Sequence, residues 1–279
     1  MIDTTAPGNP EPIWHIAFYA FVALPDPEAV AARLRELTRR LTGSILVAAE
    51  GINGVAAGVA ASLDVFEQAL ADDAVFTGCF AGMVFKRSEC RTVPFARMKV
   101  HVKREIVAFG VDGVSAPEVR DTHVSPQAWR ELIAQDNVVV LDNRNSFEYR
   151  LGKFRSAIDP GVPHFRDFPK YVEQHAPDWK ADGKRIAMYC TGGIRCEKSA
   201  AWMQALGLDV YQLDGGILNY FQSIPDADQD WQGECFVFDN RIALDTKLRE
   251  TDTTLEQVYE GEPDGEWRIA RARRLDAAS

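Results

Sequence analysis

The first half of the chain alternates apolar runs with stretches whose apolar side chains recur at helical spacing. The runs predict β-strands at residues 14–24, 45–49, 55–58, 83–86 and 97–109. A helix beginning near Pro27 and a second one with Ser62 as its N-cap are predicted between them. Their apolar faces are formed by Val30, Leu34, Leu37 and Leu41 and by Leu63, Phe66 and Leu70. The resulting β-α-β-β-α-β order is the split βαβ arrangement of a ferredoxin-like domain.

One turn of this domain has its own signal. The segment Glu50-Gly51-Ile52-Asn53-Gly54 lies between two of the predicted strands, and Asn-Gly is typical of a tight hairpin turn. We therefore expect the chain to reverse direction at Asn53 and Gly54, for which a structural role is sufficient.

The second half alternates strands with helices. The predicted strands lie at 138–141, 186–189 and 210–213, and the predicted helices at 126–134, 147–151, 165–175, 196–206 and 217–221. This alternation indicates a doubly wound parallel sheet with helices on both faces, whose ligand sites lie at the carboxyl ends of the strands. The sequence therefore predicts an α/β protein with domains at 1–113 and 121–228, a polar linker at 114–126 and an acidic, irregular extension at 229–279 with a strand-like stretch at 234–238.

Composition restricts the classes of function. The 279 residues, 46% of them apolar, can bury the cores of two domains, and the net charge of -10 excludes binding of nucleic acid by the whole surface. The five cysteines are widely spaced without a C-x-x-C pair, which argues against a disulfide framework or zinc site and favours a reducing cytoplasm. The apolar run 13–24 lacks the basic start and cleavage site of a signal peptide, and no other run approaches membrane-spanning length. We therefore expect a cytoplasmic protein with no membrane association and no bound metal.

The main candidate for chemistry is a cysteine at the carboxyl end of the strand predicted at 186–189. Backbone N–H groups and the positive end of the following helix surround such a position, and they favour the reactive thiolate. The loop consists of Cys190, Thr191, Gly192, Gly193, Ile194 and Arg195. Its glycines let the backbone curl around the sulfur, and Arg195 adds a positive charge at the rim. The predicted catalytic residues are therefore Cys190 and Arg195, with the four residues between them as an anion cradle.

The length of this loop separates two chemistries. Cysteine phosphatases place five residues between Cys and Arg around a phosphate, whereas four residues separate Cys190 from Arg195 here. The smaller cradle favours sulfur over phosphate as the group carried on the cysteine. The alternative, an ordinary buried cysteine at a strand end, does not explain the adjacent Gly-Gly and Arg.

Three further residues are predicted to lie beside the loop. Asp142 and Arg144 follow the strand at 138–141, and they either orient the loop by charged hydrogen bonds or form a helix cap and a surface ion pair. Cys196 falls on the first turn of a helix, where it either resolves a persulfide as a disulfide or is buried against the sheet. Burial is the favoured interpretation of Cys196.

A row of basic side chains is the best candidate for contacts with nucleic acid. Arg97, Lys99, His101 and Lys103 occupy alternate positions of a predicted strand and so share one face. They form either an ordinary solvated sheet face or a phosphate-binding patch, whose removal would reduce the salt dependence of RNA binding. A weaker candidate with helical spacing near the C-terminus consists of Arg268, Arg271 and Arg274.

Several motifs of the second half resemble a rhodanese domain. They are VVLDNRNSFEYRLGKF (139–154), the loop CTGGIR (190–195) and YQLDGGILNY (211–220). Together with AAEGINGVAAG (48–58), FRDFP (165–169), CTGGIRCEKSA (190–200) and ECFVFDNRIALD (234–245), they make the first 245 residues similar to the rhodanese-like tRNA uridine hydroxylase family. Two features depart from the pattern: Gly152-Lys153 stands where many rhodaneses have Gly-His, and no cysteine follows Cys235, whereas longer family members carry a cysteine-rich tail.

The resemblance implies an oxidoreductase that modifies tRNA. It implies oxygen-dependent hydroxylation of the wobble uridine to 5-hydroxyuridine, with Cys190 as the active-site cysteine and persulfide carrier and molecular oxygen as co-substrate. The ferredoxin-like domain would present the tRNA, and no protein partner is indicated. No G-x-G-x-x-G and no His/carboxylate cluster is present, so no flavin, nicotinamide or iron cofactor is expected. The alternatives are a sulfurtransferase that passes sulfur through a Cys190 persulfide, from thiosulfate for example, to a thiol or cyanide, and a binding module with an idle cysteine.

Overall fold

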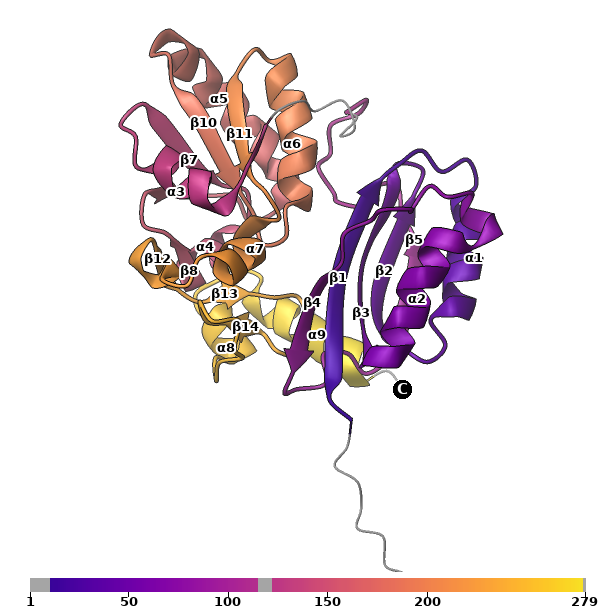
Figure 1. Ribbon diagram of the computed structural model, residues 1–279. Helices are drawn as coiled ribbons and strands as arrows, with labels where there is room; N and C mark the ends of the chain where they lie inside the picture. The colour runs from indigo at the N-terminus through magenta and orange to yellow at the C-terminus, as the bar shows by residue number, and fades with distance from the viewer. Residues whose placement is uncertain (1–10, 115–121, 278–279) are drawn as a thin grey trace, which may run out of the picture.

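The N-terminal domain is a five-stranded sheet with two helices on one face (Figure 1). The computed structural model describes residues 11–114 and 122–277. The strand order is β4-β1-β3-β2-β5. The elements are β1 (Ile13–Phe21), α1 (Pro27–Leu37), β2 (Thr42–Ala48), β3 (Gly51–Val59), α2 (Ala60–Asp72), a 3-10 turn (Ala74–Phe76), β4 (Lys86–Cys90) and β5 (Met98–Val102). The predicted ferredoxin-like arrangement is confirmed, and β5 adds an edge strand parallel to β2.

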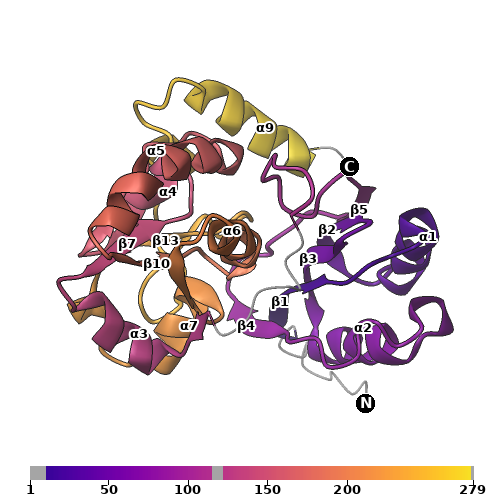
Figure 2. The same cartoon turned by 90° about the horizontal axis from the view of Figure 1, so that it is seen from above.

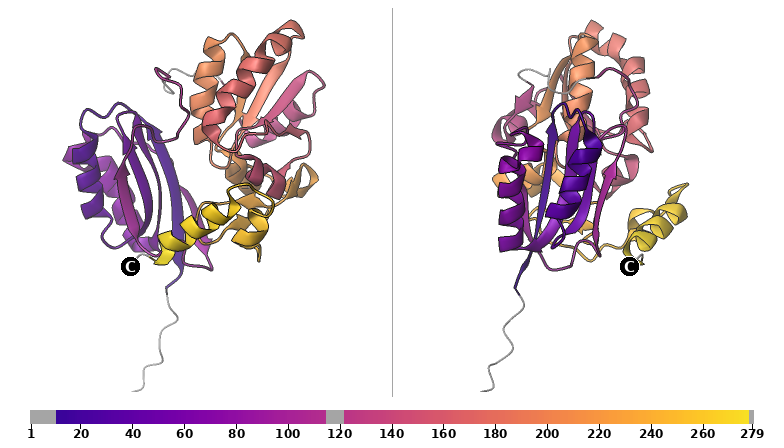
Figure 3. Two further views of the ribbon diagram at one scale, coloured as in Figure 1. Left: turned by 180° about the vertical axis from the view of Figure 1, so that it is seen from behind. Right: turned by 90° about the vertical axis from the view of Figure 1, so that its right-hand side faces the viewer.

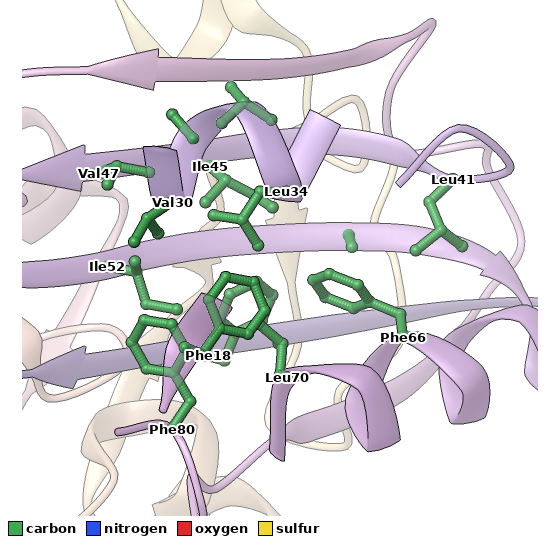
Figure 4. Packing of buried hydrophobic residues seen from close by; sticks show 14 of the residues in the cluster. Phe18, Val30, Leu34, Leu41, Ile45, Val47, Ile52, Phe66, Leu70 and Phe80 are labelled. Carbon is green, nitrogen blue, oxygen red and sulfur yellow. The ribbon is translucent and has the colours of Figure 1, made fainter. Parts of the chain in front are cut away.

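The two faces of this sheet differ in character. One face packs against α1 and α2, where Phe18, Ile45 and Val47 meet Leu34 and Phe66 in a closed apolar core (Figure 4). The other face carries the side chains of the intervening strand residues, which point away from the two helices. In the strand register, Tyr19 of β1 lies beside Asn53, Asn53 beside Leu46, and Leu46 beside His101 of β5. Among the described residues, no helix of this domain covers that second face, which we call the open face; it is turned towards the second half of the protein (Figure 1).

The predicted hairpin turn is wrong. Asn53 and Gly54 lie inside β3, and the turn consists of Ala49 and Glu50. Gly54 is required within the strand because a Cβ atom there would lie 2.7 Å from the ring of Phe18. Pairing of β3 with both β1 and β2 outweighs the local turn preference of Asn-Gly.

Other boundaries of this domain move by a few residues. Helix α2 has Val59 as its N-cap residue, so Ser62 lies within the helix and caps nothing. Leu41 lies beyond the end of α1 and joins the core from the following segment. The strand predicted at 83–86 begins only at Lys86, and the one predicted at 97–109 ends at Val102 because the chain then leaves the sheet.

The second domain is a parallel sheet of order β6-β11-β10-β7-β9 with helices on both faces, which confirms the predicted doubly wound architecture. Helices α3 and α7 pack on one face, and α5 and α6 on the other. The elements are β6 (His123–Val124), α3 (Pro126–Ile133), β7 (Val138–Asp142), α4 (Ser146–Leu151), β8 (Gly152–Phe154), β9 (Ala157–Ile158), a 3-10 turn (Phe165–Asp167), α5 (Phe168–Ala181), β10 (Arg185–Tyr189), α6 (Ile194–Ala205), β11 (Asp209–Leu213) and α7 (Gly216–Ser223). Cys190 directly follows the central strand β10.

The C-terminal extension contacts both domains. It contains a 3-10 turn (Ala227–Gln229), β12 (Trp231–Gly233), which pairs with β8, a small hairpin of β13 (Cys235–Phe236) and β14 (Ala243–Leu244), α8 (Leu255–Val258) and α9 (Gly265–Ala277). Arg241 is buried in an ion pair with Asp239 and donates to Ser88 of β4, 3.1 Å away. Helix α9 reaches from the parallel-sheet domain towards the N-terminal domain (Figures 2 and 3). The extension therefore joins the two domains and is more ordered than the sequence pattern indicates.

The linker predicted at 114–126 lies mostly on residues 115–121, outside the described residues. Its last part is structured, because β6 and the start of α3 fall within it. Across the two described ranges, none of the helices has the length and apolarity needed to cross a membrane.

Candidate active site

The Cys190 side chain is buried at the start of the predicted loop and faces backbone amides. The N–H of Gly193 donates to Cys190 Sγ at 3.1 Å. The amides of Arg195 and Cys196, at the N-terminal end of α6, also hydrogen-bond the sulfur. The carbonyl of Cys190 accepts from Ile217 of α7 at 3.0 Å, which fixes the base of the loop. The sulfur thus occupies the amide pocket that the sequence predicts.

This environment favours the thiolate. Burial raises the pKa of the Cys190 thiol, but the hydrogen bond from the Cys196 thiol, the charge of Arg195 and the backbone amides outweigh burial and lower the pKa to about 5. At neutral pH the side chain is therefore a thiolate, which is the nucleophilic form of cysteine.

The second glycine of the loop makes this geometry possible. Gly193 is the N-cap residue of α6 and has a φ of 102°, a backbone conformation that residues with a Cβ atom rarely adopt. A Cβ atom at Gly193 would also lie 2.9 Å from the hydroxyl of Tyr19. Ile194 begins the helix, so α6 starts two residues earlier than predicted.

Arg195 is buried rather than exposed at the rim. Its guanidinium forms two parallel hydrogen bonds of 2.8 Å with the carboxylate of Glu148, and it donates to Thr191 Oγ1 at 3.3 Å. Burial raises the pKa of Glu148, but the charge and hydrogen bonds of Arg195 reverse this effect and lower it. This charged fork therefore fixes the loop to α4. The role of Glu148 was not among the predictions from the sequence. Two local signals include Glu148: the motif at 139–154, and Asn145-x-x-Glu148, a capping box that marks a helix start.

Two side chains of the N-terminal domain, Tyr19 and Lys86, cover the loop, and we call them its roof. Lys86 Nζ of β4 donates to the carbonyl of Gly192, and the Tyr19 hydroxyl of β1 donates to Glu197 Oε1 at 3.2 Å. His123 of β6 contacts the same Glu197 oxygen at 2.8 Å. These residues come from separate strands, so the sequence pattern gave no indication that they meet.

A buried lysine joins the two domains beside this roof. Lys198 of α6 lies 2.8 Å from the carboxylate of Glu50 and 2.6 Å from that of Glu105, and its side chain is only 2% exposed. Glu50 also accepts from the N–H of Ile106 at 2.8 Å. This triad, which we call the interdomain latch, connects α6 to the β2–β3 turn and to the segment after β5.

Both domains match known protein families. Residues 13–106 match the UPF0176 acylphosphatase like domain, and residues 125–223 match the rhodanese-like domain. A tRNA uridine(34) hydroxylase of Brucella anthropi is 45% identical over 242 residues, which cover 86% of this chain and 77% of the relative. One of Deinococcus radiodurans is 44% identical over 249 residues, which cover 88% and 80%. The chain belongs to the tRNA uridine(34) hydroxylase family.

Membership of the tRNA uridine(34) hydroxylase family confirms the resemblance inferred from the motifs. Two residues of the interdomain latch lie in motifs of this family: Glu50 in AAEGINGVAAG and Lys198 in CTGGIRCEKSA. Two of the segments that the resemblance rests on are thus joined directly by the interdomain latch.

Asp142 and Arg144 are placed differently from both predictions. They form a fully buried ion pair of 2.6 Å, so they are not a surface pair. Arg144 donates to Asp142 and to the carbonyl of Gly152, not to the cysteine loop. The pair braces the start of β8, while Glu148 holds the loop. Between them, the Asn143 side chain donates to Ser199 Oγ of α6 at 2.7 Å.

Cys196 is buried, as the favoured interpretation expects, and it is also close to Cys190. Asn143 Nδ2 lies 3.6 Å from Cys196 Sγ, and the Cys196 thiol hydrogen-bonds Cys190. Burial and this hydrogen bond raise the pKa of Cys196, so it is a neutral thiol beside the Cys190 thiolate. Within the described ranges, no three His, Cys, Asp or Glu side chains gather as metal ligands.

The predicted basic row lies along the edge strand β5. Lys99 and His101 are in the strand, and Arg97 and Lys103 flank it. By register Lys99 and His101 lie on the open face with Tyr19. Burial and the charges of Lys103 and Lys99 lower the pKa of His101, so the row carries its positive charge mainly on arginine and lysine. Arg97, just before the strand, instead lines a surface hollow of about 440 Å³ with Arg35 and Arg39 of α1, which packs on the other face of the sheet.

The weaker basic candidate lies on α9. Arg268 pairs with Asp264 at 2.7 Å and lies over the ring of Phe147, which gives it a structural role. Arg271 lies over the half-exposed Trp267. Arg274 is exposed.

Proposed function

We propose that this protein hydroxylates the wobble uridine of tRNA to 5-hydroxyuridine, with Cys190 as its active-site cysteine and molecular oxygen as co-substrate. The proposal is supported by curated tRNA uridine(34) hydroxylases that align with both domains at about 45% identity. The observation that carries the catalytic assignment is the thiolate of Cys190, held by amides in a loop of rhodanese type. Because the substrate is tRNA, the proposal places the reaction in the cytoplasm.

The role of Cys190 follows from its ionisation. A thiolate is a strong nucleophile, and the loop stabilises negative charge at this one position. Arg195 is a positioning residue, because its two fork hydrogen bonds with Glu148 fix the loop while its charge faces the sulfur. The bases of an anticodon loop are already unstacked in part, so the wobble uridine can reach a buried site at low cost.

The open face offers the RNA a path to the cysteine. Tyr19 lies at the loop, and the basic row on β5 is three strands away, a distance of about 14 Å at the usual strand spacing. Phosphates bound by Lys99 and Lys103 would therefore leave room for a few nucleotides across the sheet. Tyr19 and Phe21, whose ring centroids are 6.2 Å apart on this face, offer aromatic surface for a base.

Complementation of a deletion strain tests the assignment. Wild-type protein should restore 5-hydroxyuridine in tRNA, measured by mass spectrometry of nucleosides, and growth without oxygen should prevent it. Cys190→Ser should restore none, because a hydroxyl of high pKa replaces the thiolate. Cys79→Ser is the matched control, since Cys79 lies partly exposed in the N-terminal domain, away from the loop.

Two outcomes would contradict the proposal. Full 5-hydroxyuridine formation by Cys190→Ser would remove the cysteine from the chemistry. Unchanged tRNA in the deletion strain, together with thiosulfate sulfurtransferase activity that depends on Cys190, would favour the sulfurtransferase alternative.

A further inference from the structure

The N-terminal domain contributes a cation to the surroundings of Cys190. Lys86 Nζ donates to the carbonyl of Gly192. A Cβ atom at Gly192 would lie 3.8 Å from this nitrogen, so the ammonium packs directly against the loop backbone. The ammonium also lies 5.6 Å from the centroid of the Tyr19 ring, and Tyr19 in turn covers Gly193. Lys86 is thus held between the loop and the open face.

The charge of Lys86 has no carboxylate partner among the described residues. The other cation near the sulfur, Arg195, lowers the pKa of Cys190 but also forms an ion pair with Glu148. Burial lowers the pKa of Lys86, and the largest opposing influence is the negative charge of Cys190, ahead of those of Asp214 and Glu197. Lys86 is therefore the cation whose main electrostatic partner is the thiolate.

We propose that Lys86 is a positioning residue of the active site, which holds Cys190 as a thiolate and fixes the loop through Gly192. The catalytic site is then complete only when the N-terminal sheet closes on the second domain. The ferredoxin-like domain accordingly does more than present RNA. The consequence for tRNA rests on the proposed function, whereas the effect on the thiol does not.

The ionisation of Cys190 depends on groups from every element packed around it. They are Arg195, Cys196 and Glu197 of α6, Glu148 of α4, Tyr19 of β1, Lys86 of β4, Asp214 after β11, and His123 of β6, which contacts Glu197. The Arg195–Glu148 fork is unchanged by substitution on β4, and burial raises the pKa of Tyr19, so its hydroxyl stays protonated between pH 5 and 7. Loss of the Lys86 cation therefore acts on the thiolate directly and raises the pKa of Cys190.

The pH dependence of alkylation tests this proposal. Iodoacetamide labelling of Cys190, followed by mass spectrometry of its peptide, should have a midpoint near pH 5 in the wild type, because the pKa is lowered to about 5. Lys86→Met should raise the midpoint by about one pH unit, and Lys86→Arg should restore it. Arg87→Gln is the matched control, because Arg87 points to the opposite sheet face and pairs with Asp64 of α2.

An unchanged midpoint in folded Lys86→Met would overturn the proposal, as would an equal shift in Arg87→Gln. If Lys86→Met does not fold, as judged by circular dichroism, Lys86→Gln takes its place and the same outcomes decide.

A second readout links the residue to the reaction. In the deletion strain, Lys86→Met should lower 5-hydroxyuridine about tenfold, because the loop loses a contact that fixes it, while Arg87→Gln should not. Normal 5-hydroxyuridine with Lys86→Met would count against the positioning role. If wild-type protein forms no 5-hydroxyuridine, the proposed function fails, and the alkylation midpoints still decide the role of Lys86.

Discussion

At the scale of single residues, the site is built from buried charges that neutralise each other. The thiolate of Cys190, the Arg195–Glu148 fork and the Asp142–Arg144 pair all lie within the second domain and are almost inaccessible to water. Cys190 and Arg195 could be predicted because they are close in sequence and belong to one loop. Glu148 could not, since its contact with Arg195 crosses 47 positions and a Glu three residues after Asn145 has a sufficient local explanation as a capping box.

The fork with Glu148 makes a testable contribution to stability. Glu148→Gln should lower the free energy of unfolding by about 3 kcal/mol, because it leaves the buried guanidinium of Arg195 without its counter-charge. Urea denaturation at pH 7 measures this difference. Since the pKa of Glu148 is lowered in the fold, the stabilisation is present above the ordinary carboxyl pKa and is lost as the pH falls below it. The difference between the two proteins should therefore shrink on acidification.

An exposed ion pair serves as the control for this measurement. Glu256→Gln removes the partner of Arg273, and both side chains are largely exposed. It should leave the urea midpoint unchanged. A loss with Glu148→Gln no larger than that of Glu256→Gln would show that the fork does not stabilise the fold.

At the scale of elements, local signals placed most helices and strands but not their ends. Ser125 caps α3 as predicted, because its side chain accepts from the N–H of Ala128, a contact within one turn. The Asn53-Gly54 signal failed because ladder pairing on both sides of β3 decides the conformation there. Contacts distant in sequence also decide the early start of α6 at Ile194. Gly193, its N-cap residue, adopts a positive φ between the sulfur of Cys190 and the hydroxyl of Tyr19.

The two glycines of the loop should respond differently to substitution. Gly193→Ala places a Cβ atom 2.9 Å from the Tyr19 hydroxyl at a φ of 102°, so it should lower the free energy of unfolding by about 1 to 3 kcal/mol. It should also raise the alkylation midpoint of Cys190, because the N–H of Gly193 moves away from the sulfur. Gly192→Ala makes only an ordinary contact, 3.8 Å from Lys86, and should change stability much less. Equal losses in the two variants would contradict this assignment of strain.

At the scale of the whole molecule, the active site depends on how the two domains close. The cysteine loop belongs to the second domain, but Tyr19 and Lys86 of the first domain cover it, and the interdomain latch holds α6 against the β2–β3 turn. Cys190 is 0% exposed in this arrangement. Access of any reagent or base to the sulfur therefore requires the roof to move.

Breaking the interdomain latch should expose the thiolate. Lys198→Met leaves the carboxylates of Glu50 and Glu105 facing each other without their cation, so the domains should separate more often. The rate of Cys190 alkylation at pH 7.5 should then rise about tenfold; the thiol is already ionised at this pH, so the rate reports access. Lys180→Met on α5, where the lysine is exposed, should leave the rate unchanged. A wild-type rate in Lys198→Met would show that the latch does not control access.

The sequence by itself determined the two α/β domains, the parallel sheet, the position of Cys190 at the end of its central strand and the family. Each of these follows from patterns that can be read along the chain: apolar periodicity, the Gly-Gly loop and the order of short motifs. The tertiary structure alone decided the Glu148 fork, the Lys86 and Tyr19 roof and the interdomain latch. These contacts join residues 47 to 178 positions apart, and such pairs are chosen by how whole domains pack, which leaves no periodic trace in the chain.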